Sequence, residues 1–140
     1  MARPITVYGD APATIAVTLR ADLSARPEPY ADGVAVGTRT PDDRRPLSGP
    51  TPLVVVSQDG PGYVQNRANT RVPIRVSVWH ATDDDAYDLA QLVHALVTTY
   101  AGPVVRSVLP GVAPTRAADP DTGEPMAWFT VTANLKPHDL

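Results

Sequence analysis

Apolar and polar residues alternate along two segments of the chain, 71–79 and 127–135. This period of two is typical of strands that bury one face. The apolar positions are Val72, Ile74, Val76 and Val78 in the first segment, and Phe129, Val131, Ala133 and Leu135 in the second. Pro73 lies inside the first segment, and because proline has no N–H to donate, we expect an edge position or a bulge there.

Two other segments show the 3.6-residue period of amphipathic helices. One would begin at Asp10, which can cap it, and end near Arg26, where prolines follow. The other follows the run Asp83–Asp85, and we expect Asp83 to cap it and Gly102-Pro103 to end it. Its broad apolar face comprises Ala86, Leu89, Ala90, Leu92, Val93, Leu96, Val97 and Tyr100.

Three further segments, 33–39, 53–57 and 104–112, are predicted to be strands. A loop at about 39–51 separates the first two, and a hairpin loop at about 113–125 follows the third. Both loops are rich in proline and charged residues. The resulting order is α-β-β-β-α-β-β. It predicts one α+β domain over residues 1–140, with a mostly antiparallel sheet and two helices packed on one of its faces.

The sheet face turned away from the helices would carry Arg75, Trp79, Trp128 and Thr130. Tryptophan and arginine are enriched at protein interfaces, so this face is a candidate contact surface. The alternative is that both tryptophans cover a corner of the monomer.

Composition narrows the classes of function. The 140 residues correspond to about one domain, and the net charge of −3 argues against a dedicated nucleic-acid binder. The absence of cysteine excludes thiol catalysis, cysteine-based zinc sites and disulfide bonds. The apolar runs are far shorter than the ~20 residues of a membrane span, and the N-terminus lacks a signal-like run, so we expect a soluble intracellular product.

Two acidic stretches offer candidate chemistry. His80 and the carboxylates from Asp83 to Asp88 would allow cation binding or acid–base work, but helix capping and the helix dipole also explain them. Residues 119–124 suggest a calcium loop, although their spacing differs from that of an EF-hand and fits turn chemistry better. No nucleophile, phosphate-loop or HExxH motif is present, so we expect no enzyme activity and no cofactor.

The segments RVPIRVSVWHATDDDAYDLAQLVHALV (71–97) and VTLRADLSARPEPYADGVAVGTRTP (17–41) resemble the tail terminator family of long-tailed bacteriophages, especially those of actinobacterial hosts. The resemblance implies an α+β subunit that forms a hexameric ring on the head-proximal end of the tail tube, stops tube polymerisation and joins the tail to the head connector. Its expected partners are copies of itself, the tail tube protein and the connector or stopper protein. Genomic DNA would pass through the lumen, and the protein would reside in the virion, after assembly in the host cytoplasm. The family implies no catalytic residues.

We hypothesise that neighbouring subunits pair heterologously, the arrangement that closes a ring. The loop at 39–51 would then order against the next subunit or the tube. The candidate interface residues are Asp42, Asp43, Arg44, Arg45, Arg75, Trp79 and Trp128.

Three other functions remain open at this stage. A head–tail stopper or tail tube subunit has similar size and composition. A small metal-dependent hydrolase would use His80, Asp84 and Asp88. A module that binds a host-cell protein is the third.

Overall fold

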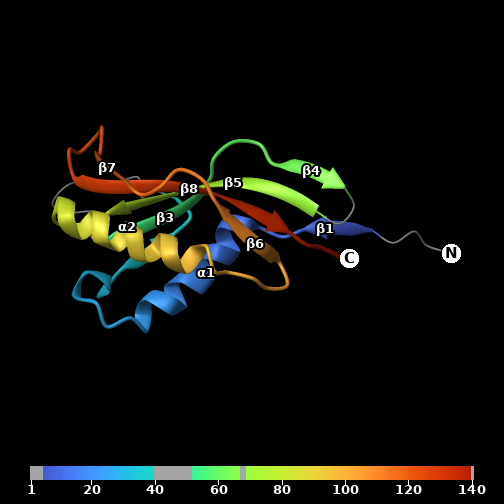
Figure 1. Ribbon diagram of the computed structural model, residues 1–140, viewed down its shortest axis with the longest axis horizontal. Coiled ribbons are helices and arrows are strands. Elements are labelled where there is room, and N and C mark those ends of the chain that lie inside the picture. The colour runs from blue at the N-terminus through green and yellow to red at the C-terminus, as the bar shows by residue number, and fades with distance from the viewer. Residues whose placement is uncertain (1–4, 40–51, 67–68, 140) are drawn as a thin grey trace.

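The computed structural model describes residues 5–39, 52–66 and 69–139 (Figure 1). Its helices are α1 (Ala11–Ser24) and α2 (Asp83–Val97), with a short 3-10 turn, η1 (Pro29–Ala31). The main sheet contains β2 (Ala35–Gly37), β3 (Leu53–Gln58), β4 (Tyr63–Asn66), β5 (Asn69–Trp79), β6 (Val105–Pro110), β7 (Thr115–Ala118) and β8 (Pro125–Leu135). A separate two-stranded sheet pairs β1 (Thr6–Tyr8) with β9 (Pro137–Asp139). The predicted α+β class is confirmed.

The two long strands β5 and β8 form the centre of the main sheet. They pair antiparallel from Thr70 opposite Leu135 to Trp79 opposite Met126. The other edge of β5 pairs with β3 along one part of its length and with β4 along another. In the same way, the other edge of β8 pairs with β6 and with β7. The strand β2 lies beyond β3 and pairs with it in parallel, whereas the other pairs in the described part of the chain are antiparallel.

Pro73 lies in a central strand, so the expectation of an edge strand is wrong. Its position explains why proline is tolerated. The ladder between β3 and β5 ends at Gln58 opposite Ile74, and the ladder between β4 and β5 begins at Tyr63 opposite Arg71. Pro73 therefore faces the turn between β3 and β4, where its carbonyl accepts a hydrogen bond from the Asp59 N–H at 2.8 Å. No strand partner there needs the N–H that proline lacks.

Both helices pack on the same face of the sheet, as Figure 1 shows. The alternating apolar residues of β5 and β8 point toward them, and Ile74, Val76, Ala133 and Phe129 are fully buried. The helices contribute Ile15, Leu19, Leu89, Ala90, Val93 and Val97 to the same core. The apolar periods in the sequence therefore identify this core correctly.

The ends of the elements differ in places from the sequence prediction. Asp10 caps α1 as expected, because its side chain accepts from the Ala13 N–H at 3.0 Å. Thr82, not Asp83, caps α2: its hydroxyl accepts from the Asp85 N–H at 3.1 Å. The helix α2 ends at Val97, before Gly102-Pro103. The segment 113–125 is not only a loop, since it contains the strand β7.

Candidate functional site

The second face of the sheet is not covered by the helices. The register places side chains from β3, β5 and β8 on it at alternate positions. We call this surface the open face. In those three strands its positions are Leu53, Val55, Ser57, Arg71, Pro73, Arg75, Ser77, Trp79, Met126, Trp128, Thr130, Thr132 and Asn134. Two of them are arginines and none is a carboxylate.

Trp128 and Arg75 form a stacked pair near the middle of the open face. The Arg75 guanidinium carbon lies 4.1 Å from the centre of the Trp128 ring, which is a cation–π contact. Both side chains are half-buried. Neither Arg75 nor Arg71 has an ion-pair partner among the described residues. The structure thus brings together two of the candidate interface residues, Arg75 and Trp128.

Trp79 shares the open face but is buried by its own chain. Its Nε1–H donates to the Asp119 carboxylate at 2.7 Å, in a buried hydrogen bond between residues 40 positions apart. It packs in a second, smaller core with Leu53, Val55 and Met126. For Trp79, therefore, the structure favours the alternative in which the side chain covers a corner of the monomer.

Two large exposed side chains lie next to the open face, and sequence reasoning did not single them out. Tyr63 of β4 is opposite Arg71 and is 69% exposed, and Leu109 of β6 is opposite Thr132 and is 43% exposed. Tyr63 belongs to a four-residue strand that follows two glycines, too short to show a period in the sequence. These residues extend the open face at the end away from Trp79.

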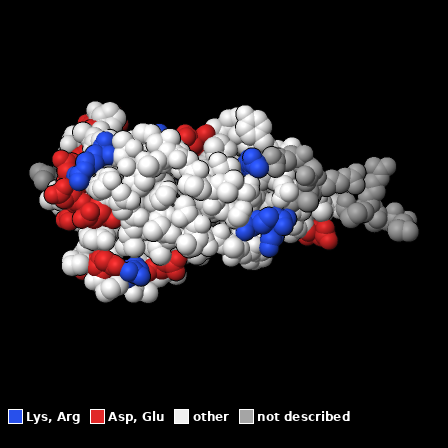
Figure 2. All heavy atoms as spheres, in the orientation of Figure 1, with Lys and Arg blue, Asp and Glu red and all other residues white. Residues whose placement is uncertain are grey.

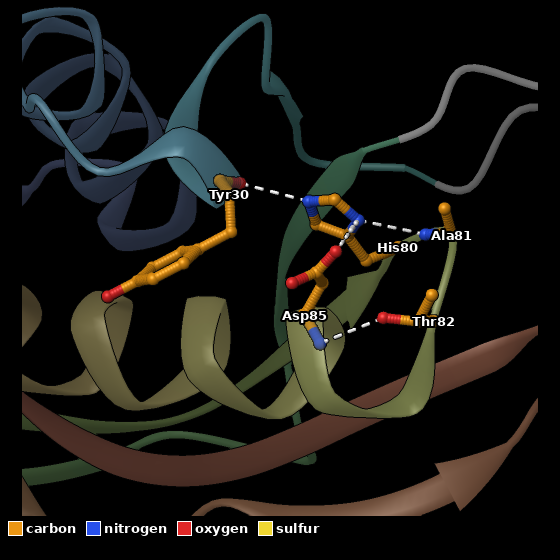
Figure 3. Close-up of polar contacts among 5 residues, drawn as sticks. All are labelled: Tyr30, His80, Ala81, Thr82 and Asp85. Atoms are coloured by element: carbon orange, nitrogen blue, oxygen red, sulfur yellow. Dashed lines mark hydrogen bonds and ion pairs between the residues drawn. The ribbon is translucent and has the colours of Figure 1, made fainter.

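His80 ties the junction between β5 and α2 to the η1 turn, as Figure 3 shows. Its Nδ1 accepts from the Ala81 N–H at 2.8 Å, so Nε2 carries the proton and donates to the Tyr30 carbonyl at 3.0 Å. The Asp85 carboxylate lies 3.9 Å from Nδ1. Both ring nitrogens are thus occupied by the backbone, which indicates a structural role.

The structure does not assemble His80, Asp84 and Asp88 into a metal site. Asp84 pairs instead with Arg116 of β7 at 3.0 Å. Within residues 5–39, 52–66 and 69–139, no group of three histidine or acidic side chains is arranged to hold a metal ion.

Residues 119–124 form a tight turn organised by Asp119. One oxygen of its carboxylate accepts from the backbone N–H groups of Asp121 and Thr122, at 2.8 and 3.2 Å. The other oxygen accepts from Trp79. Gly123, at φ 74°, closes the turn with a hydrogen bond to the Asp119 carbonyl. The turn interpretation is thus confirmed, and the carboxylate's oxygens are engaged by protein donors.

A cleft of about 240 Å³ lies between α1 and the segment 100–105. It is lined mainly by apolar groups and by Thr14 and Thr18, whose hydroxyls bond to carbonyls one turn back. Tyr100 is its titratable residue; burial, and then the nearby Asp22 carboxylate, raise the pKa of the Tyr100 hydroxyl. This cleft offers no nucleophile or acid–base pair.

Carboxylates gather at the end of the molecule where β5 meets α2, which Figure 2 shows at the left. We call this the acidic end. It consists of the η1 turn, the first turns of α2 and the β7–β8 hairpin. Its carboxylates are Glu28, Asp32, Asp83, Asp84, Asp85, Asp88, Asp119, Asp121 and Glu124, and its basic residues are Arg26 and Arg116. Asp32, Asp83, Asp88 and Asp121 have no ion-pair partner among the described residues.

The remaining candidate interface residues, Asp42, Asp43, Arg44 and Arg45, lie outside the described residues. In the part of the chain that the structure describes, no helix is long and apolar enough to cross a membrane. A scan against protein-family models gives no match for this chain, and a search of curated proteins finds none with significant similarity.

Proposed function

We propose that this protein is a structural component of a phage virion, which assembles into a ring on the head-proximal end of the tail tube. There it terminates tube polymerisation and joins the tail to the head connector. The proposal rests on the family resemblance of residues 17–41 and 71–97, together with the α+β architecture that the resemblance implies. It assigns no bond-breaking step to the chain.

The observation that carries the proposal is the open face. A sheet of this size has one face sealed by α1 and α2, while the other presents Arg75, Trp128 and the exposed Tyr63 to solvent. Tryptophan, tyrosine and arginine are the residue types that most often dominate binding energy at interfaces. A protein that acts by assembly needs such a surface, and it needs no catalytic cluster.

The charge distribution is compatible with a channel for DNA. Basic residues in the lumen would bind the DNA phosphates, and this binding would slow the passage of the duplex. The chain as a whole carries a net charge of −3, so it is not a generally basic protein that would retain DNA. The proposal therefore has DNA pass through the ring without sequence-specific binding.

Electron microscopy of the purified protein mixed with tail tubes tests this function. We expect annular particles at one end of each tube, and tubes that no longer elongate when tube subunits are added. Long cylinders formed by the protein alone would identify a tube subunit instead. Tubes that elongate normally in its presence, with bare ends, would reject the proposal.

A further inference from the structure

We infer that the open face of one copy of this chain docks the acidic end of the next copy. This inference rests on the proposed function, because it names the two surfaces that meet between neighbours in the ring.

The two surfaces differ sharply in charge. The acidic end holds nine of the carboxylates in the described part of the chain and two of its basic residues. The open face of β3, β5 and β8 holds two arginines and no carboxylate. Figure 2 shows most of the visible Asp and Glu side chains at one end of the molecule, at the left. The acidic end therefore carries a large excess of negative charge, and the charged groups of the open face are all positive.

Unpaired groups are available on both sides. Arg71 and Arg75 have no carboxylate within ion-pair distance among the described residues. On the acidic end, Arg26 pairs with Glu28 and Arg116 with Asp84, while Asp32, Asp83, Asp88 and Asp121 have no basic partner in the described chain. A second copy supplies the missing partner for each set.

Charge also selects the geometry of the contact. Two open faces brought together would oppose arginine to arginine, and two acidic ends would oppose carboxylate to carboxylate. Like charges at an interface are strongly unfavourable. Only the pairing of a face with an end is attractive, and a contact between two different surfaces is heterologous, so it leads to a ring or an open filament rather than a closed dimer.

The open face also provides an apolar centre for the contact. The Trp128 ring lies under the Arg75 guanidinium, and Leu109 and Tyr63 expose large side chains further along the same face, opposite Thr132 and Arg71. An arrangement of arginine and aromatic anchors surrounded by polar Ser and Thr is typical of an energetic centre with a polar rim.

Charge reversal with the full-length protein tests the inference. One variant, R71E/R75E, reverses the arginines of the open face; a second, D32R/D121R, reverses two exposed carboxylates of the acidic end whose side chains make no ion pair among the described residues. A third combines all four substitutions. The control D139R reverses an exposed carboxylate on β9, which belongs to the separate two-stranded sheet and to neither surface. Molar mass is measured by light scattering over a range of protein and salt concentrations, and thermal unfolding by circular dichroism verifies each fold.

We expect the wild type and D139R to form a cyclic multiple of 14.9 kDa, and each double variant to remain near 14.9 kDa. The fourfold variant is expected to remain near 14.9 kDa as well, because its acidic end keeps seven carboxylates against four basic residues and so still carries net negative charge opposite the two new glutamates. Salt at 1 M, where the Debye length is about 3 Å, should shift the wild type toward the monomer. If a reversal unfolds the chain, the neutral pairs R71Q/R75Q and D32N/D121N replace it, with a smaller loss of mass.

Assembly that survives both reversals, or that persists in the fourfold variant, would overturn the inference. A wild type that stays monomeric at all concentrations would also overturn it. The tube-capping assay separates this result from the proposed function: rings that cap tubes regardless of the reversals reject only the docking surfaces. If the variants change assembly as expected but the rings have no effect on tube growth, the proposed function is rejected and the docking surfaces are supported.

Discussion

Trp79 and Trp128 lie on the same face of the same sheet, in adjacent strands, yet their surroundings are opposite. Trp128 pairs with Ser77 in the register, two residues from Trp79. Trp79 is 5% exposed and hydrogen-bonded to Asp119, whereas Trp128 is half-buried beneath Arg75. The comparison shows that position on a face does not decide whether a tryptophan is structural. The deciding factor is whether other side chains of the same chain bury the indole and bond to it.

At Trp79, the turn that follows β7 supplies the buried Asp119 carboxylate, which accepts from the indole N–H. At the Trp128 end, no described element covers the face in this way. The strands thus build two cores of unequal size on their two faces, with a large one under the helices and a small one under the hairpin. Each of the following predictions tests one part of this difference.

The largest effect is expected from the helix-covered face. Phe129→Ala removes a fully buried ring that meets His94 edge to face, with centroids 5.0 Å apart. We expect a loss of about 3–5 kcal/mol in the free energy of unfolding, because a cavity is left in a closed core. Urea denaturation measures it. The control Thr132→Ala, on the same strand but the open face, should change stability by no more than about 0.5 kcal/mol. Equal losses in the two variants would contradict the assignment of the faces.

Trp79→Phe and Trp128→Phe test the comparison directly. Both changes keep an aromatic ring, but only the first removes a donor to a buried carboxylate. We expect Trp79→Phe to lower the free energy of unfolding by about 1.5–3 kcal/mol, the range for hydrogen bonds to charged groups, and Trp128→Phe to change it by under about 0.5 kcal/mol. Chemical denaturation followed by circular dichroism avoids relying on tryptophan fluorescence. Two variants of equal stability would show that Trp79 is not held in this way.

Gly111 tests how the edge segment between β6 and β7 is seated against β8. A Cβ at this position would lie 2.6 Å from Thr130 Oγ1 and 2.9 Å from the Thr130 carbonyl oxygen. Since the second contact is to the backbone of a central strand, we expect Gly111→Ala to cost about 1–3 kcal/mol, as overpacking does. Gly102→Ala is the matched control, because nothing lies within 4 Å of its Cβ. A neutral Gly111→Ala, measured by thermal unfolding, would show that this segment is free to move.

The smallest expected effect is the coupling between Arg75 and Trp128. A double-mutant cycle with Arg75→Ala and Trp128→Ala should give a coupling energy of about 0.5–1 kcal/mol, typical of a cation–π pair at a partly exposed site. The cycle is measured on the monomer at high salt and low concentration. A coupling of zero would mean that the stacking contributes nothing to the fold.

The sequence predicts the covered face well and the open face poorly, for a physical reason. Burial against helices imposes a period of two on β5 and β8, and Val76, Val78 and Val131 display it. Four of the short strands, β1, β4, β7 and β9, show no such pattern, because three or four residues are too few to establish a period. Their places are set by tertiary pairing.

The candidate site could be predicted only in part. Arg75 and Trp128 follow from strand alternation, so the sequence places them on one face. The bond between Trp79 and Asp119 links residues 40 positions apart and leaves no local signal. The N-cap of α2 could not be predicted from the sequence either. Thr82 is followed by three aspartates, and threonine and aspartate can both cap a helix.

The pairing of β1 with β9 determines how the fold responds to mechanical force. In this antiparallel pair Thr6 is opposite Asp139 and Tyr8 is opposite Pro137, and both chain ends leave the same end of the molecule (Figure 1). A pull that separates those ends acts along the inter-strand hydrogen bonds, which lie perpendicular to the strands and therefore break one after another. The two-stranded sheet would open like a zipper at low tension, while the long β5–β8 ladder stays intact.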